Sequence, residues 1–119
     1  MQFDFDKFRS IVSSIYPTDP EETTYTPEQS LAVFYCYFQY YEHHRKQPHP
    51  PIKADQILNI IRSMNWMFDE YEEPMELFPE DYPAMIAKHF KTQYRCCDYN
   101  INHFFSGKIR TLRYYEVCY

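Results

Sequence analysis

Apolar residues recur every three or four positions along most of the chain, and prolines separate these periodic segments. Residues 4–16 carry such a stripe, and they predict a first helix that Asp4 or Asp6 caps and Pro17 stops. The segment 17–25 reads PTDPEETTY, which is typical of an acidic, extended connector. The proline positions therefore predict separate helices rather than one long one.

A second helix is expected from Thr26 to about Lys46, because 48-PHPP-51 forbids its continuation. Thr26 can cap this helix, Pro27 suits its first position, and Gln29 completes a capping box. Its middle reads FYCYFQYY, so it is aromatic on nearly every side, whereas an ordinary surface helix has one apolar stripe. We expect this helix either to be central in the domain or to lend one face to a partner.

A third helix is predicted to open at Pro50 and Pro51 and to continue as far as Tyr71. Its apolar stripe consists of Ile57, Ile60, Ile61, Met64, Phe68 and Tyr71. The acidic run 69-DEYEE-73 ends it before Pro74, although acids oppose the macrodipole at a helix C-terminus. The run is therefore either a frayed, solvated end or an acidic patch for a partner.

Three further helices are expected after Pro79. The first has an inward stripe of Tyr82, Met85, Ile86, His89 and Phe90. A short helix at 99–105 is capped by Asp98, and a last helix is capped by Ser106. In the last helix we expect Ile109, Leu112 and Tyr115 to face inward, and Arg110 and Arg113 to face outward. No hairpin signal or internal repeat is apparent.

These elements together predict an all-α fold, a single-domain bundle of five or six helices around residues 27–46, spanning residues 1–119. The chain has one glycine, Gly107, which excludes folds that cradle a phosphate or nucleotide on a glycine-rich turn. Gly107 lies where the last two helices meet, so it is expected to adopt a left-handed conformation there.

The net charge of −5 argues against a dedicated nucleic-acid-binding protein. The charge is uneven, because residues 1–78 are net acidic and residues 79–119 are net basic. The first residues, MQFDFDKF, do not resemble a signal peptide, and no apolar run is long enough to span a membrane. We therefore expect a cytoplasmic protein whose four cysteines are free thiols.

Metal and cofactor motifs are incomplete. The segment 98-DYNINH-103 matches the first, third and fifth places of a calcium loop, but His103 and Ile109 occupy places that need glycine and glutamate. Cys96 and Cys97 are adjacent, and neither a CxxC nor an HxxxH motif occurs. We expect no cofactor and no metal, and only distant residues could converge on a structural zinc ion.

The aromatic excess points to protein binding, since tyrosine and tryptophan dominate interface hot spots. We expect a non-enzymatic module that binds a partner protein or a homodimer mate. An inhibitor or accessory protein of a phage or mobile element fits this size and acidity. The expected partner-binding residues are Tyr37, Tyr40, Tyr41, Asp69, Glu70, Glu72 and Glu73.

Two alternatives remain. A helical nucleic-acid-binding domain would use Asn100 or Asn102 to read an adenine edge and basic residues to hold phosphates. Its basic residues would be Lys88, Lys91, Arg95, Lys108, Arg110 and Arg113. An enzyme would use Cys97 as a nucleophile with His103 as its base.

Overall fold

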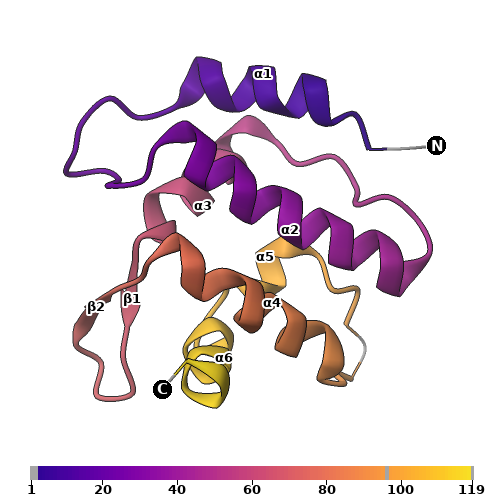
Figure 1. The fold of residues 1–119 in the computed structure, drawn as a ribbon, viewed down its shortest axis with the longest axis vertical. Helices are drawn as coiled ribbons and strands as arrows, with labels where there is room; N and C mark the ends of the chain where they lie inside the picture. Colours follow the sequence, from indigo (N-terminus) through magenta and orange to yellow (C-terminus); the bar gives the residue numbers. More distant parts are fainter. Residues whose placement is uncertain (1–2, 96, 119) are drawn as a thin grey trace.

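The computed structural model describes residues 3–95 and 97–118, and this part of the chain is mostly helical with one small hairpin (Figure 1). The elements are α1 (Phe5–Ile15), α2 (Pro27–Arg45), α3 (Ala54–Met64), β1 (Trp66–Phe68), β2 (Pro74–Glu76), the 3-10 helix η1 (Pro79–Asp81), α4 (Tyr82–Lys91), α5 (Ile101–Phe104) and α6 (Ile109–Val117). The expectation of a mostly helical chain is therefore confirmed.

The helices pack in the order α1, α2, α4, α6 across the face seen in Figure 1. Helix α2 contacts α1 on one side and α4 on the other, and α4 also contacts α6. Helix α1 packs on α3 as well, and the β1–β2 hairpin projects beside α6. The Cα atoms span 39 × 37 × 21 Å, so the molecule is a flattened slab in which the hairpin lies at one corner.

The first two helices begin where their capping residues predict. The Asp4 carboxylate accepts the Lys7 N–H at 3.0 Å. At α2, Thr26 Oγ1 accepts the Gln29 N–H at 3.2 Å, and the Gln29 side chain accepts the Thr26 N–H at 2.8 Å. Helix α2 ends at Arg45, and the next residue, Lys46, has a left-handed backbone and donates its N–H to the Glu42 carbonyl at 2.9 Å. These local hydrogen bonds confirm the predicted bounds of α2.

The third helix departs from the prediction at both ends. It begins at Ala54 rather than at Pro50, and it ends at Met64 rather than at Tyr71. Side chains satisfy its last carbonyls: Trp66 Nε1 donates to Arg62 O at 3.1 Å, and the Tyr82 hydroxyl donates to Met64 O. These side-chain donors satisfy carbonyls that the end of a helix exposes. The helix can therefore stop at Met64, and the chain continues as a strand.

Residues 66–76 form an antiparallel hairpin that the sequence did not predict, so the expectation of a continuous helix here is wrong. Trp66 pairs with Glu76, Met67 with Met75, and Phe68 with Pro74. The acidic run 69-DEYEE-73 forms the turn of this hairpin. The Asp69 carboxylate accepts the N–H groups of Tyr71 and Glu73 at 2.8 and 2.9 Å, and Glu72 is left-handed with φ 63°.

The core is a single cluster of buried side chains, mainly aromatic and aliphatic, to which all the longer helices except α6 contribute. Helix α2 buries Val33, Phe34, Tyr37, Phe38 and Tyr41 in it. The inward stripe of α4 is confirmed, because Tyr82, Met85, Ile86, His89 and Phe90 are all buried.

The last two helices start later than predicted. Helix α5 is capped by Asn100 rather than Asp98, and the N-cap position of α6 is Lys108 rather than Ser106, with no capping hydrogen bond from its side chain. Gly107 is left-handed, with φ 52°, as its position predicts. Lys46, Glu72 and Tyr99 also adopt left-handed backbone, so this glycine-poor chain makes such turns with other residues as well.

Candidate functional site

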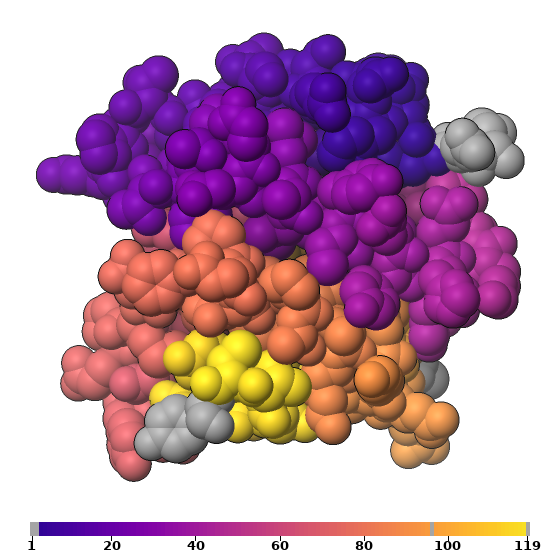
Figure 2. Space-filling model, in the orientation of Figure 1, coloured from indigo at the N-terminus to yellow at the C-terminus, as the bar shows by residue number. Residues whose placement is uncertain are grey.

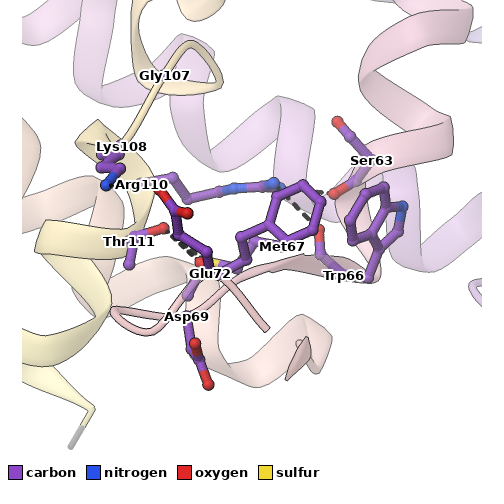
Figure 3. A pocket seen from close by; sticks show the side chains of 10 residues that line it. Ser63, Trp66, Met67, Asp69, Glu72, Gly107, Lys108, Arg110 and Thr111 are labelled. Carbon is purple, nitrogen blue, oxygen red and sulfur yellow. Dashed lines mark hydrogen bonds and ion pairs between the residues drawn. The ribbon is translucent and has the colours of Figure 1, made fainter. Parts of the chain in front are cut away.

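A groove of about 510 Å³ lies between the hairpin and the start of α6 (Figure 3). Its lining combines residues from the acidic run with residues from the basic C-terminal segment, which the sequence assigned to two different sites. The lining residues are Ser63, Trp66, Met67, Phe68, Asp69, Glu72, Gly107, Lys108, Arg110 and Thr111. Lys108 Nζ lies 3.4 Å from the Glu72 carboxylate, so an ion pair of two exposed side chains joins α6 to the hairpin turn.

The outer edge of β1 forms one wall of the groove. The register directs the backbone groups of Trp66 and Phe68 away from β2, because the residues that flank β1, Asn65 and Asp69, hydrogen-bond to Leu77 and Glu73, which flank β2. Arg110 Nη2 donates to Trp66 O at 3.0 Å, and Thr111 Oγ1 donates to Phe68 O at 2.9 Å (Figure 3). Side chains of α6 thus cover the free carbonyls of this edge strand.

Arg110 is buried, with 7% of its surface exposed, so the prediction that it faces outward is wrong. Its Nη1 donates to Ser63 O at 2.6 Å and to the Tyr82 hydroxyl at 2.9 Å, and its guanidinium lies 5.0 Å from the Phe105 ring centroid. Burial raises the pKa of Tyr82 to about 12, although the Arg110 charge opposes this shift. Arg110 therefore joins α6 to the end of α3.

Arg113 is also 7% exposed, so its predicted outward orientation is wrong too. Its Nη1 donates to Thr92 Oγ1 at 2.6 Å and to the Tyr94 hydroxyl at 2.9 Å, and its Nη2 lies 2.6 Å from Glu116. The inward face of α6 consequently carries the two arginines, while Leu112 is 55% exposed. The two guanidinium groups donate to polar groups at the ends of α3 and α4, since buried polar groups are usually hydrogen-bonded. The spacing of apolar residues in the sequence does not reveal these contacts.

Some of the basic residues predicted to bind nucleic acid are therefore engaged within the protein, and others are exposed. Arg110 and Arg113 are used inside the protein, Lys88 lies 3.7 Å from Glu116, and Lys108 pairs with Glu72. Lys91 and Arg95 are exposed. Asn100 and Asn102, the residues predicted to contact an adenine edge, hydrogen-bond to each other: Asn102 Nδ2 donates to Asn100 Oδ1 at 3.1 Å.

The residues predicted to bind a partner likewise include both buried and exposed side chains. Tyr37 and Tyr41 are 0% and 2% exposed, so the prediction that they are surface tyrosines is wrong, whereas Tyr40 is 39% exposed. The Tyr37 ring can be buried because its hydroxyl donates to a buried acceptor, Tyr99 O, at 2.6 Å. Asp69 stabilises the turn and Glu72 pairs with Lys108, while Glu70 and Glu73 are exposed.

The structure instead places large aromatic rings on the outward face of the hairpin. Trp66 is 39% exposed, Phe68 is 52% exposed, and their ring centroids lie 5.1 Å apart in an edge-to-face arrangement. Tyr71 at the turn is 78% exposed. Met67, between Trp66 and Phe68 in the sequence, is buried, so the side chains of β1 alternate between the surface and the interior. All three residues of 66-WMF-68 are apolar, so no alternation of apolar and polar residues marks this strand in the sequence.

We call this region the hairpin surface. It consists of three aromatic and three acidic side chains, all exposed: Trp66, Phe68, Tyr71, Glu70, Glu73 and Glu76. In the space-filling view the hairpin projects at the lower edge of the molecule, beside α6 (Figure 2). The Trp66 indole N–H already donates to Arg62 O, so the ring is fixed and its apolar faces remain for contacts.

A second group of chemically active residues lies beside α5. Cys97 Sγ lies 3.4 Å from His103 Nδ1, as the sequence pairing suggested, and the Tyr99 N–H donates to Sγ at 3.2 Å. Cys96 lies outside the described residues. Within residues 3–95 and 97–118, no three His, Cys, Asp or Glu side chains converge to hold a metal ion. Asp98 and Asn100 accept N–H groups two residues on, so 98-DYNINH-103 forms turns.

Comparison of the chain with protein-family models, curated proteins and solved structures finds no match. Among the described helices, none is both long and apolar enough to cross a membrane.

Proposed function

We propose that this protein is a non-enzymatic interaction module that binds a partner protein through the hairpin surface. The observation that carries the proposal is the pair Trp66 and Phe68, which together with Tyr71 leave large apolar area exposed on a short projecting hairpin. We infer further that residues 1–119 act as one domain around α2, because the buried side chains of the described residues form one cluster.

The aromatic rings supply the expected binding energy. An aromatic side chain can bury about 150–250 Å², and tryptophan and tyrosine are enriched among residues that dominate binding. The hairpin already holds Trp66 and Phe68 in one arrangement through the indole hydrogen bond and the strand pairing, so binding costs little side-chain entropy.

The acidic side chains define the chemistry of the partner. Glu70, Glu73 and Glu76 are exposed on the same hairpin, with Glu76 directly opposite Trp66, and no hydrogen bond or ion pair within the described residues engages their carboxylates. Lysine or arginine side chains complement such carboxylates and also pack on aromatic faces. The partner is therefore a protein segment that presents cationic and apolar side chains together.

Strand addition is not the expected mode. Arg110 and Thr111 occupy the free carbonyls of β1, and Pro74 in β2 has no N–H to donate. We therefore infer recognition by side chains. An acidic module that covers a basic surface in this way would act as an inhibitor or accessory protein of its partner.

Peptide selection tests the proposal. A displayed library of random peptides is selected on the immobilised protein, and the enriched peptides are titrated against the protein in solution. Trp66 is the sole tryptophan of the chain, so its emission reports binding directly. We expect enriched peptides to combine Lys or Arg with apolar residues and to shift Trp66 emission to shorter wavelength.

Variants separate the hairpin from α2. Phe68→Ala is expected to weaken peptide binding about tenfold or more, whereas Tyr40→Ala, the matched control on α2, leaves it unchanged. Loss of binding in Tyr40→Ala but not in Phe68→Ala would overturn the assignment to the hairpin. Failure to enrich any basic peptide, together with salt-sensitive retardation of DNA or RNA, would favour the nucleic-acid alternative instead.

A further inference from the structure

Cys97 differs from the other described cysteines in what surrounds its sulfur. Its Sγ accepts the Tyr99 N–H at 3.2 Å and lies 3.4 Å from His103 Nδ1. A backbone N–H donor and an adjacent imidazole are contacts that assist a cysteine sulfur as a nucleophile. Cys97 and His103 are each partly exposed, and Cys97 also packs against the core.

Cys36 and Cys118 are half-buried as Cys97 is, but within the described residues no histidine forms a hydrogen bond with their sulfur atoms. Burial raises the pKa of the Cys36 thiol, and burial followed by the Asp81 charge raises that of Cys118. The Cys118 thiol donates to Asp81 O at 3.6 Å, which further favours its protonated form. These two cysteines therefore serve as internal references for an ordinary, unreactive thiol in the same molecule.

The His103 ring packs against two other rings. Its ring centroid lies 4.7 Å from that of Tyr94 and 5.3 Å from that of His89. Burial, helped by the charges of His103 and Arg113, lowers the pKa of His89 to about 3, so His89 is neutral near neutral pH and does not repel an imidazolium. The Tyr37 hydroxyl lies near both Cys97 and Asp98.

A buried polar atom also lies beside the pair. His89 is wholly buried, its Nδ1 is 3.3 Å from the Tyr94 hydroxyl, and its Nε2 has no hydrogen-bond partner within the described residues. Such an unsatisfied atom is uncommon in folded proteins, and a redox or catalytic role is one of its explanations.

We propose that Cys97 is a reactive thiol that forms a mixed disulfide with low-molecular-weight disulfides, with His103 as its base. The thiol proton passes to His103 Nδ1, and Sγ attacks one sulfur of the disulfide. The S–S bond of the disulfide breaks, and its second sulfur leaves as a thiolate that takes the proton from His103. Cys97 is thereby oxidised, and one sulfur of the small molecule is reduced to a thiol.

This site is independent of the hairpin surface, because it consists of residues 97–103 and the α4 side chains packed on them. It is a site of stoichiometric modification rather than catalysis, so it does not depend on the proposed partner binding.

Reaction with glutathione disulfide tests the proposal, followed by mass spectrometry of proteolytic fragments. Cys96→Ser is used as the parent protein so that modification at position 97 is unambiguous. We expect Cys97 to be modified at least about tenfold faster than Cys36 and Cys118 near neutral pH. His103→Gln is expected to reduce the Cys97 rate about tenfold, whereas His43→Gln, an exposed control, leaves it unchanged.

Two results would overturn the proposal: equal rates at the three cysteines, or an unchanged Cys97 rate in folded His103→Gln.

Discussion

Arg110 donates a hydrogen bond to the backbone carbonyl of Trp66 across 44 positions of sequence, at 3.0 Å. The same guanidinium also bonds to Ser63 O and to the Tyr82 hydroxyl, so one buried side chain holds α6, the end of α3 and the hairpin together. The position of the exposed Trp66 ring on the hairpin surface therefore depends on an arginine that is itself almost entirely inside the protein.

Removal of Arg110 is expected to destabilise the fold strongly. Arg110→Ala leaves two carbonyls and the Tyr82 hydroxyl without their donor, and such a change costs about 3–5 kcal/mol when the partners are buried. Urea denaturation followed by circular dichroism measures it. Arg62→Ala is the matched control, because its ion pair with Glu22 is exposed and contributes about 0–1 kcal/mol. Equal stability of the two variants would contradict the buried role of Arg110.

The two tyrosines Tyr37 and Tyr40 should respond differently to loss of the hydroxyl group. Tyr37→Phe removes the buried hydrogen bond to Tyr99 O and is expected to lower the free energy of unfolding by about 1–2 kcal/mol. Tyr40 is 39% exposed, so Tyr40→Phe is expected to change stability by less than about 0.5 kcal/mol. Denaturant midpoints of the two variants measure the difference, and similar midpoints would show that Tyr37 is not buried as described.

Acid should destabilise the protein through two buried histidines. His49 Nε2 accepts the Ile101 N–H at 3.0 Å and its Nδ1 lies 2.8 Å from Pro50 O, so the folded state needs the neutral ring. Burial lowers the pKa of His49, and burial lowers that of His89 to about 3. Both pKa values lie below the unfolded value, so the unfolded state binds more protons in acid.

The stability contributed by these histidines is fully present above about pH 6.5 and is lost as the pH falls from there towards the folded pKa values. The expected loss is about 1.4 kcal/mol per pH unit for each histidine within that window. Urea midpoints measured across this pH range test it. The exposed control His43→Gln should reproduce the wild-type pH dependence, and a wild-type midpoint that does not move with pH would refute the prediction.

Left-handed positions should respond oppositely to gain and loss of glycine. A Cβ at Gly107 meets no atom within 4 Å, so Gly107→Ala is destabilising only through its backbone, by about 1 kcal/mol. Gly107→Val is expected to cost more, because β-branched residues tolerate positive φ poorly. Lys46→Gly, at φ 61° at the end of α2, is expected to stabilise the protein by up to about 1 kcal/mol. Thermal or urea unfolding measures the stability of all three variants. A Gly107→Ala variant as stable as the wild type would contradict the expected backbone strain at position 107.

The hairpin illustrates why sequence reasoning failed at one point. Residues 57–71 carry a helical stripe, and the local pattern of 66-WMF-68 is too short to compete with it. The helix ends at Met64 because side chains from Trp66, Tyr82 and Arg110 satisfy its last carbonyls. Two of these donors are distant in sequence, so no local pattern predicts the end of α3.

The sequence by itself determined the elements whose ends are fixed by neighbours within about four residues. The Asp4 cap, the Thr26–Gln29 capping box and the left-handed Gly107 follow from backbone chemistry that acts locally. Tertiary structure alone decided which polar groups are buried. Arg110, Arg113 and Tyr37 lie inside because acceptors far away in the sequence meet their donors. Without these acceptors their burial would be too costly, since an unpaired polar group loses its hydration and gains nothing in return.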